Sequence, residues 1–455
     1  MRKDIDMLNG PLGPSIIRFT IPVILTTLLQ TLFSTIDLIV IGQFCGSLKV
    51  AAVTATSTLT NLLISLLSGL SLGAGLTVAR ALGSNRTDDI SHAVHTAIPT
   101  ALIGGLLLSI FGTIFSPTLL ELMNTPADVL PLASVYMRIY FSGIVFTIVY
   151  NFCTAILRAA GDTKTPLFFL MLAGILKVVL NVFVVAVCKM DVAGVALATI
   201  LSQAVAATLV ILALIRRSDA CKLSIKKLRF HKKPLLAILR IGLPAGIQTA
   251  LISLANLINS VALNSFDSAA ILSGNGASLS LELFTDAIGI GFTQATPNFI
   301  AQNLGARQFD RMKKAFITCM GYAAVFVFAA SMLMYVFGEQ LLRLYITDSA
   351  EALAYGLIRM RYVLIPGFFM AAMTVSTGGL QGLGHSMSAT IITLTTNCAL
   401  RIIWIYTVFA IPEYHTLDYL YMAYPISWIT TTAMEAPLFF IYLKKKTRSP
   451  LLERT

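Results

Sequence analysis

The stretch from Arg216 to Arg240 reads RRSDACKLSIKKLRFHKKPLLAILR and holds nine basic residues against a single acid, Asp219. Long apolar segments flank it on both sides, and these two sides resemble each other. Arg18-Phe-Thr-Ile-Pro22 opens the first half, and Arg240-Ile-Gly-Leu-Pro244 opens the second half 222 residues later. The stretch therefore indicates a cytoplasmic connector between two copies of one membrane-embedded unit.

Composition also indicates a membrane protein. Of 455 residues, 56% are hydrophobic and 12% are charged, whereas soluble domains carry about a quarter charged residues. The net charge of +12 would suit a nucleic-acid partner, but the basic residues collect in alternate loops, so no nucleic acid is expected. The six cysteines are scattered without a C-x-x-C pair or a nearby histidine, so neither disulfides nor a metal site are expected. No phosphate-cradling loop or cofactor motif is present in the sequence.

Apolar runs of about 20 residues recur along the chain, and each can span a bilayer. The distribution of lysine and arginine places both termini in the cytoplasm, which makes the number of spans even. We predict twelve transmembrane helices, at 15–42, 50–80, 92–115, 130–157, 166–188, 192–215, 235–263, 270–302, 314–336, 357–381, 388–410 and 419–443.

The expected fold is an all-α integral membrane protein with two six-helix bundles. An even number of helices per half gives both halves the same orientation, so their pseudo-twofold axis should run along the membrane normal, with a substrate cleft between the bundles. The expected parts are an N-terminal lobe (1–215), the basic connector (216–234), a C-terminal lobe (235–443) and a basic cytoplasmic tail (444–455).

The two halves agree best at the end of the second helix of each. Gly69 to Asp88 recurs as Gly291 to Asp310, with identical residues in five register positions. With the Arg and Pro pairs described above, seven positions share the same 222-residue offset, which is more than coincidence supplies. The shared positions in the first half are Gly69, Ala79, Leu82, Gly83 and Asp88.

These residues resemble the multidrug and toxic compound extrusion (MATE) family. The resemblance rests on the paired A-x-x-L-G helix ends at Ala79–Gly83 and Ala301–Gly305, on LRAAGDTKTP at Leu157–Pro166 and on VAGVALAT at Val192–Thr199. It covers nearly the whole chain. It implies a secondary transporter that expels cationic or amphipathic compounds in exchange for protons or sodium ions.

Asp37, in Ser34-Thr-Ile-Asp37-Leu-Ile-Val-Ile-Gly42 of the first helix, is the first candidate for a coupling-ion site. A carboxylate within a bilayer costs about 2.5–3.5 kcal/mol on insertion scales, so it should face a cavity or a partner. The resemblance implies the same role, since the family carries an acid in this stretch, and in one branch that acid binds the coupling cation. The alternative is an acid that only holds helices together through Ser and Thr hydroxyls.

Lys177 and Asn181 of the fifth helix are expected to modify this site. The family commonly shows N-x-x-L-D here, whereas this chain has Lys-x-x-Leu-Asn, which adds a positive charge and removes a negative one. At about 1.5 Å per residue, Asp37 and Lys177 lie at depths that the lysine side chain can bridge. We therefore predict a Lys177–Asp37 pair in which the ammonium replaces a sodium ion, so that protons rather than sodium couple transport. A lysine that snorkels away to water is the alternative.

The substrate-binding candidates lie mainly in the second half. Glu282 and Asp286 are four residues apart on the eighth helix and share one face. Two acids there could attract a cationic substrate, or could share a proton because like charges disfavour ionising both. Pairing with Arg401 or another buried base is the alternative, and Arg401 and Glu435 themselves most simply indicate structural pairing.

Three amides and one aromatic residue complete the candidates for substrate binding: Gln248, Asn256, Asn259 and Tyr150. Amides in membrane helices also bind neighbouring helices, and aromatic residues that could form cation–π contacts with a drug are also ordinary packing residues.

An enzyme is not expected. Gly69-Leu-Ser71-Leu-Gly73 matches the G-x-S-x-G pattern of hydrolases, but that pattern needs a strand-to-helix elbow and triad partners. Here it lies within an apolar helix, where Gly69 and Gly73 form a G-x-x-x-G packing face. The sequence therefore predicts a plasma-membrane antiporter, working as a monomer, that exports small organic compounds in exchange for a proton or, less favoured, a sodium ion. A flippase of a lipid-linked glycan is the main alternative, which a strongly cationic cleft would favour.

Overall fold

A computed structural model describes residues 4–123, 125–347 and 349–448, so the part of the basic tail after Arg448 lies outside the described chain. The described residues form helices joined by short loops, with no strand among them. Ten of these helices are long and apolar enough to cross a membrane, and α4 with α5 form an eleventh span that bends by 47°. The 37-residue helix α9 is long enough for a twelfth span at about 1.5 Å per residue. The expected all-α membrane fold is confirmed.

The described chain divides into two compact units. The first holds residues 4–6 and Leu25–Ala250, and the second holds Met7–Ile24 and the chain from Leu251 onward. Helices α1 (Leu12–Cys45) and α8 (Lys232–Asn264) therefore each contribute to both units. The lobes expected from the internal repeat have their boundary in the basic connector, whereas the compact units are divided within α1 and α8.

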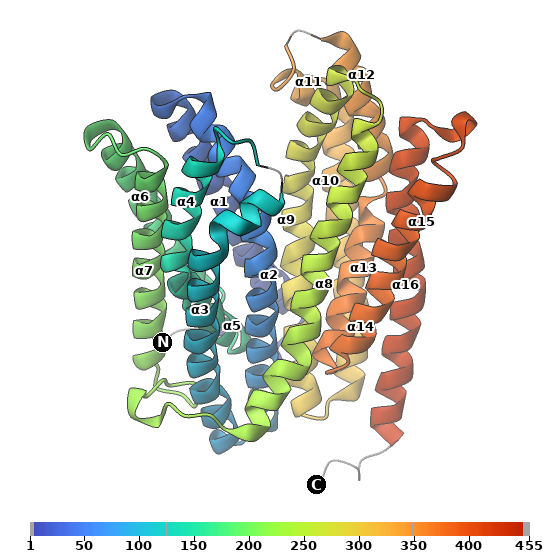
Figure 1. Ribbon diagram of the computed structural model, residues 1–455. Coiled ribbons are helices and arrows are strands. Elements are labelled where there is room, and N and C mark those ends of the chain that lie inside the picture. The colour runs from blue at the N-terminus through green and yellow to red at the C-terminus, as the bar shows by residue number, and fades with distance from the viewer. Residues whose placement is uncertain (1–3, 124, 348, 449–455) are drawn as a thin grey trace. The chain divides into compact units, whose positions relative to one another are not determined.

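The first unit also contains six complete helices, drawn mainly in blue to green in Figure 1. Within it α2 packs on α3 and α5, α5 packs on α7, and α6 packs on α7. The helices are α2 (Ser47–Ser84), α3 (Thr87–Leu122), α4 (Leu130–Ser142), α5 (Ile144–Ala159), α6 (Lys164–Val182), which continues as a π-helical turn (Phe183–Val187), and α7 (Val192–Ile215).

The second unit contains the remaining helices, mainly yellow to red in Figure 1. Within it α13 packs on α9, α10 and α16, and α12 packs on α9. The helices are α9 (Ala269–Gly305), α10 (Phe309–Val336), α11 (Gly338–Arg343), α12 (Ala350–Arg359) with a π-helical turn (Met360–Leu364), α13 (Gly367–Gly382), α14 (Ser386–Thr393) with a π-helical turn (Leu394–Ala399), α15 (Leu400–Thr407) and α16 (Leu417–Arg448).

Glycines allow α2 and α8 to pack at close range within the first unit. A methyl group on Gly69 would overlap the backbone of Gly246, and a methyl group on Gly73 would lie 2.8 Å from the Gly242 nitrogen. Each helix thus brings a G-x-x-x-G pair to the contact, which confirms the packing face predicted for α2. This contact explains why the first half of α8 belongs to the first unit.

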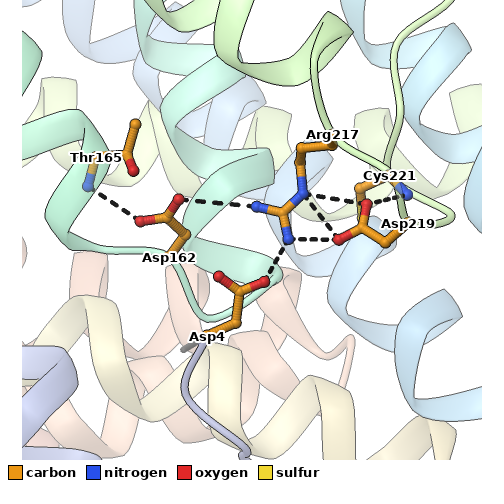
Figure 2. Close-up of polar contacts among 6 residues, drawn as sticks. All are labelled: Asp4, Asp162, Thr165, Arg217, Asp219 and Cys221. Carbon is orange, nitrogen blue, oxygen red and sulfur yellow. Dashed lines mark hydrogen bonds and ion pairs between the residues drawn. The ribbon is translucent and has the colours of Figure 1, made fainter. Parts of the chain in front are cut away.

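Arg217 of the basic connector ties three segments of the first unit together (Figure 2). Its Nη2 lies 2.5 Å from both Asp4 Oδ2 and Asp219 Oδ2, and its Nη1 lies 3.8 Å from Asp162 Oδ2. The Arg217 side chain is only 4% exposed. Burial alone would lower the pKa of Arg217, but the carboxylates of Asp219 and Asp4 raise it above its ordinary value, so the guanidinium stays charged.

The Leu157–Pro166 motif forms the loop that receives these contacts. Gly161 has φ +87°, and a side chain there would crowd the backbone of Ile5, whose N–H donates to the Gly161 carbonyl over 3.2 Å. Asp162 Oδ1 accepts from the Thr165 N–H over 3.0 Å, at the first turn of α6. The motif therefore begins α6 and anchors the N-terminal segment at the same point.

Candidate functional site

Asp37, Lys177 and Asn181 meet inside the first unit. Lys177 and Asn181 are four residues apart on α6, so both side chains project from one face of the helix toward Asp37 on α1. The Lys177 ammonium lies 2.5 Å from Asp37 Oδ2, and Asn181 Nδ2 donates to Asp37 Oδ1 over 2.5 Å. The predicted Lys177–Asp37 contact is confirmed.

This charged pair is largely shielded from water. The side chains of Asp37 and Lys177 are 11% and 12% exposed, and Asn181 is fully buried. In such surroundings opposite charges attract more strongly than in water, and either charge left alone becomes costly. An apolar cluster lies beside the pair and includes Val40, Ile41, Tyr136 and Val185.

The surroundings of Asp37 suit both of its protonation states. Each carboxylate oxygen has one donor, from Lys177 or from Asn181. Within the described chain, Asn181 Oδ1 is buried and accepts no hydrogen bond. Because an amide carries both a donor and an acceptor, a rotated Asn181 could accept the proton of a neutral Asp37. The site can thus exchange an ion pair for a protonated acid.

Glu282 on α9 pairs with Arg359 on α12 in the second unit. Arg359 Nη1 donates to Glu282 Oε2 over 2.7 Å, and the two side chains are 4% (Arg359) and 12% (Glu282) exposed. Pairing with a buried base was the alternative to substrate binding for this acid, although the base is not Arg401. Asp286, one turn further along α9, makes no hydrogen bond to the described residues.

Sequence reasoning missed Arg359. The helix was expected to begin at residue 357, which would leave this arginine at the membrane surface. Instead α12 begins at Ala350, where the Ser349 side chain accepts from the Ala352 N–H over 3.1 Å. Arg359 therefore lies about 14 Å along the helix from its start. The N-cap serine is the signal that could have located it.

The amide candidates differ in their surroundings. Gln248 is 4% exposed and belongs to the first unit. Asn256 accepts a 3.4 Å hydrogen bond from Arg401 Nη1, and Asn259 is 5% exposed with neither amide atom paired among the described residues. Tyr150 is buried, and its hydroxyl donates to the Pro166 carbonyl over 3.3 Å. In this conformation Tyr150 supports the start of α6.

Arg401 and Glu435 do not pair with each other. Arg401 donates to Ser427 and Asn397, each over 2.9 Å, and its guanidinium lies 4.3 Å from the centre of the Tyr424 ring. Glu435 accepts from two threonine hydroxyls instead. The expected ion pairing of these two buried charges is therefore wrong, because hydroxyl, amide and aromatic groups satisfy each of them separately.

The G-x-S-x-G pattern lies inside α2, where Ser71 donates to the Ser68 carbonyl over 2.7 Å. A helical serine bonded to its own backbone lacks the elbow that a nucleophile needs. No group of three or more His, Cys, Asp or Glu side chains within the described ranges could hold a metal ion.

Comparison with known proteins decides the family. The MatE family model matches residues 22–183 and again residues 244–407, so it matches the chain twice. The chain belongs to the MATE family. The two matches begin 222 residues apart, at Pro22 and Pro244, which is the offset of the internal repeat.

Similar MATE relatives are known from two bacteria. The chain is 28% identical over 402 residues to the probable multidrug resistance protein YpnP of Bacillus subtilis, which covers 88% of this chain and 89% of that protein. It is 26% identical over 392 residues to the multidrug export protein MepA of Staphylococcus aureus, which covers 85% of each.

Solved transporter structures share the fold. A multidrug resistance MATE transporter in an outward-facing conformation gives a TM-score of 0.91 at 19% identity, covering 98% of this chain and 99% of that one. A transporter from Pyrococcus furiosus, described as having a binding pocket of reversed polarity, gives a TM-score of 0.89 at 19% identity. The match covers 99% of this chain and 99% of that chain. This chain is thus a multi-pass membrane transporter of the MATE family.

The MATE motifs that carried the resemblance are packing elements. Ala79 and Ala301, which open the paired A-x-x-L-G helix ends, are 0% and 1% exposed at equivalent points of α2 and α9. The LRAAGDTKTP motif forms the loop before α6 that is described above. The residues that carried the resemblance therefore belong to the helical scaffold.

Proposed function

We propose that this chain is a secondary active antiporter that exports cationic or amphipathic organic compounds by alternating access, driven by proton influx. Export is supported by MATE membership and by relatives named as multidrug resistance or export proteins. We also propose that the protein works as a monomer in the plasma membrane with both termini in the cytoplasm. The distribution of basic residues among the loops supports this orientation.

One observation carries the choice of protons over sodium: the Lys177 ammonium lies 2.5 Å from Asp37. A sodium ion would have to share the Asp37 carboxylate with a fixed positive charge, and the Asn181 Nδ2–H group points at the second oxygen. The fixed ammonium repels a metal cation. A proton needs only one carboxylate oxygen, and the Asn181 amide can accept its hydrogen bond.

The exchange follows from competition for one carboxylate. When a proton binds Asp37, the attraction to Lys177 is lost, and Lys177 becomes a buried cation without a partner. This favours a conformation in which the ammonium reaches water or the proton leaves. We expect substrate to bind preferentially to the conformation in which Asp37 is ionised and paired with Lys177, so proton and substrate bind in alternation. Such opposed binding is what antiport requires of a coupling site.

Substrate contacts are proposed at the polar positions predicted from the sequence. Asp286 is the strongest of these, because it makes no hydrogen bond to described residues while neighbouring Glu282 is held by Arg359. The remaining candidates are Glu282, Gln248, Asn256, Asn259 and Tyr150. The flippase alternative rests on the cations Lys177 and Arg401. Lys177 has a carboxylate partner, whereas Arg401 has none among the described residues and is held by Ser427 and Asn397.

Transport of ethidium into proteoliposomes tests this function. A proton gradient should drive ethidium transport by the wild-type protein, and an equal sodium gradient should not. Asp37→Asn should reduce proton-driven transport at least tenfold, whereas Asp191→Asn, at a half-exposed acid of the same unit, should leave it unchanged. Sodium-driven transport, or full activity of Asp37→Asn, would contradict the coupling mechanism.

A further inference from the structure

Glu435 lies within α16, and the mechanism proposed above does not use it. It precedes Lys444, at the charged end of that helix, by nine residues, or about 14 Å along the helix axis. The side chain is 0% exposed. An ionisable group at this depth, away from water, requires either a charged partner or a neutral form.

Two threonine hydroxyls meet the Glu435 carboxyl group. Thr377 Oγ1 on α13 lies 2.7 Å from Oε2, and Thr393 Oγ1 on α14 lies 3.0 Å from Oε1. Neither α13 nor α14 contains an Asp, Glu, Lys, Arg or His residue. Across the described residues, no cation pairs with Glu435.

The ionisable groups on the other elements packed against α16 do not pair with Glu435 either. Arg359 on α12 pairs with Glu282, and Arg401 on α15 binds Ser427 and Asn397. Arg361, which follows α12, is exposed, Cys398 donates to the Leu251 carbonyl, and Cys319 lies buried on α10. The Glu435 environment therefore supplies hydrogen bonds and no compensating charge.

A protonated carboxyl group fits this environment better than a carboxylate. Burying an unpaired carboxylate is costly, and two hydroxyl donors replace only part of its hydration. A hydroxyl can also accept a hydrogen bond. One threonine can therefore donate to the carbonyl oxygen of a neutral Glu435 while the other accepts its proton, so that every polar atom in the cluster is used.

A second group of buried polar side chains lies one turn away on α16, where Thr431 precedes Glu435 by four residues. Thr396 Oγ1 and Thr431 Oγ1 lie 2.5 Å apart, and Asn397 Nδ2 donates to Thr431 over 3.1 Å. Thr396 and Asn397 belong to the π-helical turn Leu394–Ala399, and such turns occur often at functional sites. Asn397 also accepts from Arg401 over 2.9 Å, so this second group contains the cation and the Glu435 cluster does not.

We infer that Glu435 is a second proton-binding site of the protein, occupied at neutral pH in the described conformation and built by Thr377 and Thr393. Its ligand is the proton itself. The occupancy of this site does not depend on the proposed antiport function, whereas its participation in transport would rest on that function. Asp37 and Glu435 would then be separate proton sites in the first and second units.

Infrared difference spectroscopy of the purified protein tests this directly. The wild-type protein at pH 7 should show the carbonyl band of a protonated carboxylic acid, shifted in heavy water. Glu435→Gln should abolish this band, while Asp37→Asn should retain it. Glutamine can replace both hydrogen bonds of the neutral acid, so this variant should fold. If the wild-type and Glu435→Gln spectra are identical in this region, Glu435 is ionised and the inference is wrong.

Threonine variants and a sodium-binding measurement test the proposal further. Thr393→Val should shift the band to higher frequency by removing a hydrogen bond, and Thr393→Ser should restore its position. Calorimetric sodium binding that is lost in Glu435→Gln would identify a metal-cation site and overturn the proton assignment. Ethidium transport tests the proposed function separately. If the wild-type protein does not transport ethidium, the proposed function is wrong, and the infrared spectra still show whether Glu435 is protonated.

Discussion

Replacing Lys177 by methionine tests the central charge pair most directly. Methionine keeps the length of the apolar stem and removes the ammonium that lies 2.5 Å from Asp37. Both side chains are nearly nine-tenths covered, so the remaining carboxylate has only Asn181 as a partner. Breaking one side of a buried pair typically costs about 3–5 kcal/mol. For a unit of this size, the expected fall in Tm is about 6–20 °C.

A second ion pair of the same unit supplies the matched control. Lys49 Nζ lies 2.5 Å from Asp191 Oδ1, but these side chains are 25% and 49% exposed. Exposed pairs contribute about 0–1 kcal/mol, so Lys49→Met should hardly change Tm. Because the charged atoms of both pairs lie 2.5 Å apart, a difference between the two Tm shifts reports the difference in burial.

Thermal unfolding in detergent, followed by intrinsic fluorescence, provides the assay. Because Asp37→Asn removes the charge that Lys177→Met leaves unpaired, the double variant should be more stable than Lys177→Met alone, with a coupling of at least about 2 kcal/mol. Equal Tm shifts for Lys177→Met and Lys49→Met, or strictly additive effects in the double variant, would refute the reasoning.

Three further predictions concern packing, the connector and pH. Gly246→Leu should prevent assembly of the first unit, measured as loss of detergent-extractable monodisperse protein, whereas Gly321→Ala, with open space around it, should be neutral or stabilising by up to about 1 kcal/mol. Arg217→Ala should cost about 2–3 kcal/mol in thermal unfolding, and lysine should rescue it only partly because it lacks the planar fork. Burial and the neighbouring His92 lower the pKa of His231, so the unfolded chain binds this proton more readily than the folded chain does. The Tm should therefore fall as the pH drops below about 6.5. His231→Gln should make the Tm depend less on pH in this range.

The sequence was sufficient for the fold class and for the Lys177–Asp37 contact, because each depended on where charges lie in apolar surroundings. The basic connector and the 222-residue repeat predicted two similar membrane halves, and the family model matched the chain twice. The Lys177–Asp37 contact was predictable because a lysine and an acid, each within an apolar helix, had compatible depths. Both inferences required only hydropathy, helical rise and the cost of a buried charge.

The second unit was harder to predict because its charged residues depend on precise helix starts. Hydropathy predicts Arg359 at the membrane surface, whereas the Ser349 cap starts α12 seven residues before the predicted start. Glu435 was expected to seek a base, yet threonines from two other helices satisfy it. Thr377 and Thr393 carry no pattern that distinguishes them from other membrane threonines, so only tertiary structure identifies them.

The lysine at Asp37 also determines how the site responds to salt in the medium. A counter-ion tethered by its own side chain has an effective concentration that does not fall when the surroundings are diluted. Free sodium must compete with this built-in ion at every concentration, which makes the site insensitive to ordinary changes in ionic strength. In the proposed mechanism a change in pH acts differently, because protonation of Asp37 would remove the charge that holds the tethered ion.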